Sequence, residues 1–373
     1  MQNGSYNLKY ITIIIKIIMA GTWILIIFGV LLFPDFKRID SKNSINVLTW
    51  SGMYSLSYIS KFEKETGIKV RFSYYESNEE LLVKLRATKG QGYDLIIPSD
   101  YAVYNLKKDK LLKKINKNKL DFLDNLNPIL LGHYFDKKNK YSLPAEWAVF
   151  GLGINNNYFK NAKNLPQSWA LVFDDKLINK YNYKIAISND PLVAIPVTTL
   201  YIYPNLDNLN QEKLSKVQNI LKKIRPYIEA YIELKPDYYL VNQSAQIAVA
   251  SSAHIFRAMQ NNKFIDFIVP QEGTLVTIEN FAIPKDTHKE DLVYKFINFL
   301  MKPESVEYNF KNEQSLLPVT LNAIKHKDLA GTIKKLLTIK KEDFNKFHFL
   351  RMDKLKKPIT EEYLRELFIK SKL

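Results

Sequence analysis

The segment YDLIIPSDYAV, residues 93–103, decides the class of the fold. Its apolar run, residues 95–97, lacks the alternation of polar side chains typical of a half-exposed strand, so it predicts a strand buried on both faces, as in a parallel sheet. A hydroxyl, a carboxylate and an aromatic ring follow the strand directly: Ser99, Asp100 and Tyr101. Side chains of this kind at a strand end indicate either helix capping or a ligand, and we expect Asp100 to cap the next helix.

Two further strand and helix pairs precede this segment. Alternation and apolar spacing predict strands at residues 45–50 and 68–76, and helices at 56–66, 77–90 and 104–115. Strands that alternate with helices over so short a length predict a doubly wound α/β domain. In such sheets ligands bind beyond the carboxyl ends of the strands.

Aromatic and hydroxyl side chains occupy two of these strand ends. Trp50 and Ser51 end the first strand, and Ser99 and Tyr101 follow the third, so these four should face one crevice. The rings could stack on a ligand or bind a cation through their faces, although each could also be an ordinary packing aromatic.

A second α/β unit follows, with less regular spacing. We expect strands at residues 149–157, 183–187, 246–250 and 264–269, and helices at residues 208–231, 251–260 and 288–301. Asp190 ends one of these strands and could bind a ligand or be a turn or N-cap residue before Pro191. Glu279 lies in a stretch, residues 274–284, that returns to the first unit, and it could also be a solvent-facing strand residue. Trp147 and Trp169 are expected in the core.

Composition excludes several classes of protein. The chain of 373 residues has no cysteine, which rules out disulfides, thiolate catalysis and cysteine metal sites. Its five histidines form no ligand cluster, and no phosphate-binding loop or nucleophile elbow is present, so we expect no enzyme, no cofactor and no metal. A net charge of +16 would suit nucleic acid or an anionic membrane, but the lysines are scattered and no nucleic-acid-binding motif occurs.

The N-terminus carries a long apolar segment. Residues 11–33 are apolar apart from Lys16 and a few small or hydroxyl residues, close to the ~20 residues that span a bilayer. The sequence after it, PDFKRIDSKNS, has no Ala-x-Ala cleavage site. We therefore expect an uncleaved signal anchor that holds the protein at the outer face of the cell membrane.

Several quoted motifs together resemble those of a known family. They are FEKETGIKVRFSYYESNEELLVKL, GYDLIIPSDYAV, KYSLPAEWAVFGLGIN, VPQEG and YKFINFLMKPES. With them the chain resembles the bacterial spermidine/putrescine-binding proteins, the substrate receptors of ATP-driven polyamine importers. The resemblance covers nearly the whole chain after about residue 44.

The resemblance implies a fold and its division. It implies a two-lobed α/β fold of the periplasmic-binding-protein-like type II, with two hinge crossings, preceded here by the signal anchor. The anchor and linker would take residues 1–43, and the first lobe residues 44–150 and 276–325. The second lobe would take residues 151–275 and 326–373.

The resemblance also implies ligand-binding residues. Carried over by motif, these are Trp50, Ser51, Tyr54, Ser99, Tyr101, Asp190 and Glu279. A polyamine alternates ammonium groups with methylenes, so carboxylates alternating with aromatic walls would fit it.

The chain departs from the family pattern at several of its positions. Met53, with Tyr54 one place on, stands where the family has a tyrosine, and Val193 stands where it has a glutamate. Ser251, with His254 nearby, and Thr277 stand where the family has tryptophans, and Leu317 stands where it has another tyrosine. A lost carboxylate removes a charge-assisted contact of about 1.5–3 kcal/mol.

The sequence thus favours an extracytoplasmic polyamine receptor that works with the permease subunits of an ABC importer. Two alternatives stay open. The same fold could bind another small ligand, or the protein could be an exposed adhesin that no longer transports.

Overall fold

The computed structural model describes residues 15–16, 18–19, 21–23, 42–162, 165–232, 235–312, 316–321, 323–324, 329, 331–355 and 357–373. The chain divides into two compact units, Met1–Ser44 and Ile45–Leu373. Most of the expected anchor, residues 11–33, lies outside the described residues, and those described between 15 and 23 are helical. Among the described residues no helix is long and apolar enough to cross a bilayer, so the anchor stays a prediction.

The larger unit begins with the alternating strands and helices expected from the sequence. They are β1 (Ser44–Trp50), α2 (Leu56–Thr66), β2 (Lys69–Tyr75), α3 (Asn78–Ala87), β3 (Leu95–Ile96) and α4 (Asp100–Lys108). Ser77 caps α3 by accepting from the backbone N–H of Glu80, as its position predicts. The helix expected at residues 104–115 is α4, which begins four residues earlier, at Asp100, and ends seven residues earlier, at Lys108.

One mixed sheet runs through this unit. In the part of the chain that the structure describes, the sheet has eleven strands. Eight of them follow the order β2-β1-β3-β9-β4-β7-β5-β6, and the other three, β8, β10 and β11, pair with β4 or β9 off this path. β1 and β3 are parallel, as expected, whereas β9 (Thr274–Ala282) is antiparallel to β3. The α/β class is therefore confirmed, and the sheet is mixed.

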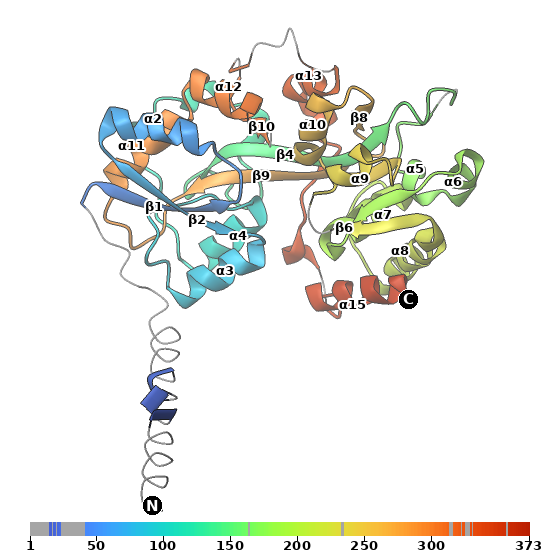
Figure 1. Ribbon diagram of the computed structural model, residues 1–373, viewed down its shortest axis with the longest axis horizontal. Helices are drawn as coiled ribbons and strands as arrows, with labels where there is room; N and C mark the ends of the chain where they lie inside the picture. Colours follow the sequence, from blue (N-terminus) through green and yellow to red (C-terminus); the bar gives the residue numbers. More distant parts are fainter. Residues whose placement is uncertain are drawn as a thin grey trace, which may run out of the picture. The chain divides into compact units, whose positions relative to one another are not determined.

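Strand β4 (Ser142–Asn155) links two regions of the sheet. Its first half pairs with β9 and its second half with β7 (Ile247–Ser251) and β8 (Ile265–Ile268), all antiparallel. Figure 1 shows β4 and β9 side by side along the unit. A Cβ at Gly151 would come within 2.5 Å of β8, so only glycine lets these strands approach so closely.

The second region of the sheet is covered by further helices. It adds β5 (Ile185–Ser188) and β6 (Ile228–Ile232), with helices α5 (Ala170–Phe173), α6 (Asp175–Tyr181), α7 (Pro191–Ile202), α8 (Gln211–Ile224), α9 (Asp237–Val241) and α10 (Ser252–Asn261). α7 is not among the helices expected from the sequence. Pro191 stands in its first turn, where the missing N–H needs no partner.

The chain returns to the first region before its last segment. The closing elements are α11 (Glu290–Leu300), α12 (Pro303–Asn312), β10 (Leu317–Pro318), α13 (Gly331–Leu337), α14 (Lys341–Phe344), β11 (Phe347–His348) and α15 (Glu361–Lys372). β11 pairs with β9, and α15 contacts α7 and α8.

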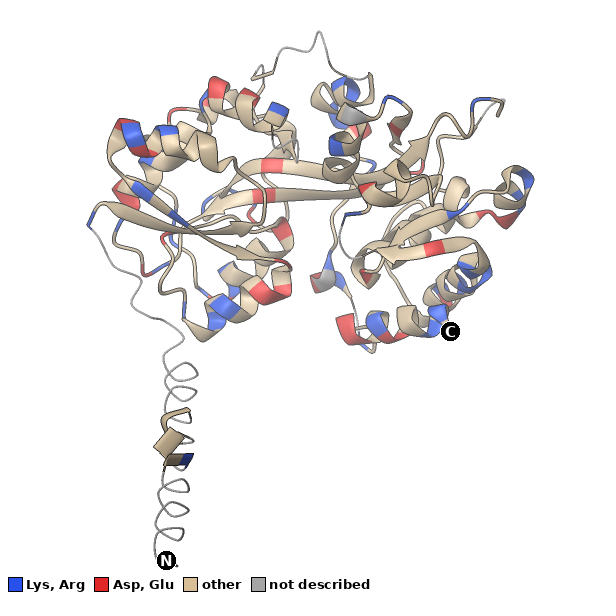
Figure 2. Cartoon of the chain, viewed as in Figure 1, with Lys and Arg blue, Asp and Glu red and all other residues tan. Residues whose placement is uncertain are grey.

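Two clusters of buried apolar side chains form the core. One gathers around β1, β3, α2, α4 and α11 and includes Trp147; the other gathers around α7, α8 and α15 and includes Trp169. Both tryptophans are almost fully buried, as expected. Lysines and arginines are spread over helices and loops of both regions (Figure 2), as the scattered pattern in the sequence indicated.

Candidate functional site

A cleft of about 600 Å³ lies where the carboxyl ends of β1 and β3 meet β9 and the start of α7. Its lining residues belong to both regions of the sheet. We call one set the first wall: Trp50, Ser99, Asp100, Tyr101, Thr277 and Glu279. We call the other set the second wall: Phe150, Asp190, Leu192, Val193, Ile232 and Arg365.

The carboxylate of Glu279 is the centre of the first wall. It accepts hydrogen bonds from Trp50 Nε1 at 2.8 Å and from Ser99 Oγ at 2.9 and 3.0 Å. Ser99 also pairs with Glu279 as an isolated antiparallel bridge, so the hydroxyl is positioned by backbone contact. Trp50 is fixed in turn by Tyr75, whose ring centre lies 4.5 Å away. Contacts within the protein therefore fix the geometry of this part of the wall.

Burial leaves Glu279 costly to ionise. Its side chain is almost fully buried, and no ion pair of the described residues includes it. Burial raises the pKa of Glu279 to about 7, the bonds from Trp50 and Ser99 offset part of this rise, and the nearby Asp100 adds to it. A cation placed against Glu279 would favour its charged form.

The expectation that Asp100 caps the following helix is wrong. Ser99 is the N-cap of α4 and Asp100 is its first helical residue. The Asp100 carboxylate accepts from Tyr134 Oη at 3.0 Å and from the backbone N–H of Ile278, on β9, at 3.2 Å. Burial raises the pKa of Asp100 to about 6, and these hydrogen bonds hold it from rising further. Asp100 therefore forms a second carboxyl group in the floor of the first wall.

The second wall is mostly apolar. Val193, Leu192 and Ile232 line it together with the ring of Phe150. Asp190 caps α7 by accepting from the backbone N–H of Leu192 at 2.8 Å. Asp190 as a whole is exposed, but the protein around its carboxylate raises the pKa of this group. The hydrogen bond from the N–H of Leu192 and the nearby charge of Arg365 offset part of this rise. This carboxylate thus serves its own helix while it also faces the cleft.

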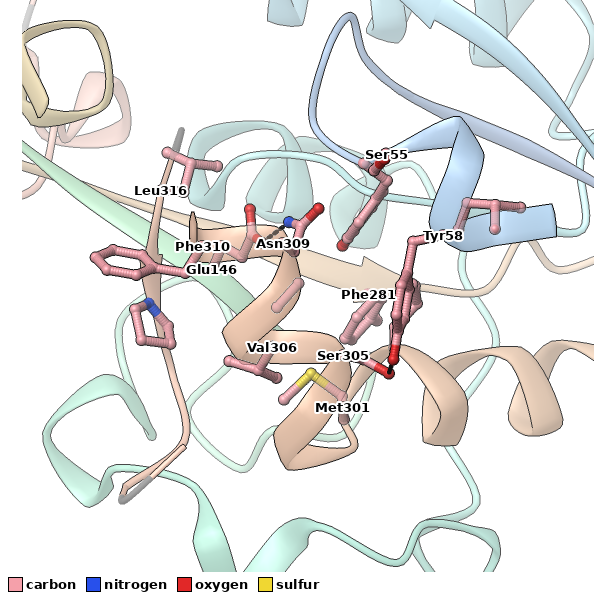
Figure 3. A pocket seen from close by; sticks show the side chains of 15 residues that line it. Ser55, Tyr58, Glu146, Phe281, Met301, Ser305, Val306, Asn309, Phe310 and Leu316 are labelled. Atoms are coloured by element: carbon pink, nitrogen blue, oxygen red, sulfur yellow. Dashed lines mark hydrogen bonds between the residues drawn. The ribbon is translucent and has the colours of Figure 1, made fainter. Parts of the chain in front are cut away.

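Two sequence-predicted site residues do not line the cleft. Ser51 is exposed in the turn after β1. Tyr54 lines a separate small cavity of about 20 Å³, room for roughly one water molecule, together with Glu146 and Asn309. Figure 3 shows Glu146 and Asn309 in this cavity, joined by a hydrogen bond of 2.8 Å. The structure therefore brings five of the seven predicted residues together.

Glu146 is a buried carboxyl group that the sequence did not single out. It pairs across the strands with Glu279, and its Oε2 atom and the Tyr54 hydroxyl have no hydrogen-bond partner among the described residues. Burial raises the pKa of Glu146 well above its usual range, and the nearby Glu279 raises it further. The cavity behind the first wall thus holds a carboxyl group that is costly to charge.

The positions that depart from the family pattern have different surroundings. Val193 and Thr277 line the cleft, and Thr277 donates to Asp100 at 3.3 Å. Ser251 instead caps α10, and Leu317 is fully buried on β10. Burial lowers the pKa of His254 to about 4, so this residue is neutral, and it does not line the cleft.

Sequence reasoning also missed residues at the cleft edge. Glu76 and Glu79 lie where β2 leads into α3, and their motif YESNE was part of the quoted resemblance, so the signal existed. Arg365 had no such signal, since it stands four residues after Glu361 on a helix, which is the usual pattern of a solvated surface.

Comparison with known proteins places these features in a family. The sequence pattern of bacterial extracellular solute-binding proteins matches residues 57–335. A putrescine-binding periplasmic protein of Pseudomonas aeruginosa, SpuD, is 32% identical over 272 residues, which cover 70% of this chain and 74% of that protein. The spermidine/putrescine-binding periplasmic protein of Escherichia coli is 29% identical over 265 residues, 71% of this chain and 74% of that one.

Solved structures agree on the fold. A Listeria monocytogenes protein assigned to spermidine/putrescine ABC transport superimposes with a TM-score of 0.74 at 26% identity, over 89% of this chain and 99% of that one. The Streptococcus pneumoniae substrate-binding protein PotD superimposes with a TM-score of 0.73 at 23% identity, over 88% and 98%.

Proposed function

The chain belongs to the family of bacterial extracellular solute-binding proteins, and from this premise we propose that it is the polyamine receptor of an ABC importer. The observation that carries the proposal is the charge of the cleft. Among the described residues, five carboxyl side chains line it, Glu76, Glu79, Asp100, Asp190 and Glu279, against the single cation Arg365. The whole chain carries a net charge of +16, so this concentration of acid is local and suits a cationic ligand.

The two walls suit different parts of an alkyl amine. One ammonium group would lie against Glu279 and Asp100, beside the ring faces of Trp50 and Tyr101. The methylenes would lie along the apolar second wall, and a second ammonium group would reach Asp190 at its edge. The relatives named for spermidine or putrescine binding support this assignment.

Another large hollow suits a cation poorly. A cavity of about 700 Å³ beside α10 and α13 is lined by Lys263, Lys311 and Lys335 with one carboxylate, Asp266. Its positive charge would repel an ammonium group, so volume alone does not select the site.

We also propose how the cleft closes and where the protein is located. The two regions would act as the lobes of a solute-binding protein, with β4 and β9 as the hinge crossings and the boundaries given above. The protein would present its ligand to permease subunits and catalyse no reaction. Residues 11–33 would tether it to the outer face of the cell membrane.

Calorimetric titration of the full chain in detergent with putrescine and with spermidine tests the proposal. We expect saturable binding of at least one of them, with one ligand per chain. If neither putrescine nor spermidine binds, the polyamine assignment is wrong. It would favour another small ligand, which the neutral Val193 and the cationic Arg365 of the second wall also allow.

A further inference from the structure

The mouth of the cleft carries a charge cluster contributed by three separate helices. We call this the mouth cluster: Glu79 of α3, Asp190 at the start of α7, and Glu361 and Arg365 of α15. Three of its members, Glu79, Asp190 and Arg365, line the cleft, and the fourth, Glu361, forms an ion pair with Arg365. Segments far apart in the sequence thus meet at one entrance.

Arg365 is the cation of this cluster. Its Nη2 atom lies 3.2 Å from Glu361 Oε1, and about half of its side chain is exposed. Burial raises the pKa of both Asp190 and Glu79; the charge of Glu361 adds to this rise, and the charge of Arg365 opposes it. Arg365 therefore stands among three carboxylates and balances part of their charge.

A guanidinium in this position can replace a ligand group. Arginine stays protonated at all physiological pH values and cannot be neutralised by its surroundings. Without Arg365 the mouth would hold three carboxylates with no cation, a suitable place for an ammonium group. A ligand carboxylate is disfavoured at the same place, since it would face those three carboxylates.

We infer that Arg365 is a specificity-determining residue that takes the place of a third ammonium group at the mouth. The cleft then favours an amine with two ammonium groups, one at Glu279 and one at Asp190, over a longer amine with three. This inference rests on the proposed function and names the ligand class within it.

Titration of the full chain with putrescine, which has two ammonium groups, and spermidine, which has three, tests the inference. Arg365→Gln should shift the ratio of the two affinities about tenfold toward spermidine, as expected for one charge removed at a partly exposed site. The conservative Arg365→Lys should keep the wild-type ratio. Lys370→Gln is the matched control, since Lys370 forms the same type of pair with Glu366 on α15, at 3.4 Å.

The outcomes separate the inference from the proposed function. An unchanged ratio in Arg365→Gln, or a ratio that Lys370→Gln or Arg365→Lys shifts equally, would overturn the role of Arg365 while the receptor function stands. Equal weakening of both ligands in Arg365→Gln would also overturn it and indicate a structural role for the ion pair with Glu361. Wild-type protein that binds neither amine would overturn both.

Discussion

The two walls of the cleft present their carboxylates in opposite ways. On the first wall, Glu279 is buried and its oxygens accept hydrogen bonds from Trp50 and Ser99. On the second wall, Asp190 is exposed, and its hydrogen bond serves the start of its own helix. A fixed, desolvated carboxylate discriminates strongly between charged and neutral partners, whereas an exposed one is screened. The first wall should therefore set affinity, and the second wall should set preference among ligands.

Removing the charge of Glu279 should have the largest effect. In Glu279→Gln the side chain keeps its size, but the ammonium group loses its buried counter-charge. We expect putrescine affinity to fall about 100-fold, which corresponds to the ~1.5–3 kcal/mol of a charge-assisted hydrogen bond. Titration calorimetry of the full chain measures this loss.

Glu146→Gln is the control for this change. Glu146 pairs with Glu279 across the strands but lines the small cavity behind the wall, so binding should change by less than about threefold. An equal loss in both variants would show that buried charge in general, rather than Glu279, determines binding. This variant should also unfold at a slightly higher temperature near neutral pH, since a carboxyl group that burial makes costly to charge has been removed.

The raised pKa of Glu279 also predicts that putrescine affinity depends on pH, by somewhat less than the effect of Glu279→Gln. In the free protein this group holds its proton below about pH 7, while an ammonium ligand requires the carboxylate. Affinity should rise about 30-fold between about pH 5.5 and about pH 8 and then level off, with a proton released on binding. Titrations in two buffers of different ionisation enthalpy measure that proton.

Two further results would check this assignment. Glu279→Gln should remove most of the pH dependence; a slope that survives would belong to Asp100, whose pKa is raised to about 6. The ligand-free protein should also lose stability as pH rises from about 4.5, where the unfolded carboxyl ionises, through about 7. Above that pH the penalty is complete.

The charge of Asp190 should contribute less. Asparagine caps a helix about as well as aspartate, so Asp190→Asn removes the charge and keeps α7 intact. We expect affinity to fall about tenfold at low salt and less at higher salt, as for an exposed charge. Asp174→Asn is the matched control, since Asp174 caps α6 in the same way, with the N–H of Lys176, and does not line the cleft. A loss larger than that of Glu279→Gln would reverse the ranking of the walls.

Local sequence signals sufficed for most of the first wall. Trp50, Ser99 and Tyr101 follow strand ends, and parallel strands bring such ends to one edge whatever the rest of the chain does. Asp100 could not be placed in this way, since its partner Ile278 is 178 positions away and the contact depends on how β9 enters the sheet. The position of Tyr54 could not be predicted for a similar reason: it lines a cavity that α12 closes, and no local pattern indicates that helix as its neighbour.

The second wall was harder to predict from local pattern. Pro196 argues against a helix in this apolar run, because proline is disfavoured inside a helix. Pro191 is compatible with one, because a helix tolerates proline in its first turn. Arg365 looks like any surface residue, because an arginine four residues after a glutamate is the ordinary pattern of an exposed helix. Only the packing of α15 against α7 brings it to the cleft.

The smallest expected effect is a gain on the second wall. Val193 is the third helical residue of α7, after the cap Asp190, a position where glutamate is favoured by the free N–H groups of the helix start. Val193→Glu would add a carboxylate to the apolar wall at a buried position, and we expect putrescine to bind only about threefold tighter, since the cost of desolvating the new carboxylate offsets most of its attraction for the ligand. Titration against Val193→Gln separates charge from size, because both side chains fill the same space. If Val193→Glu weakens binding while Val193→Gln does not, the apolar surface at this place contacts the methylenes, and preference on this wall then arises from shape rather than from charge.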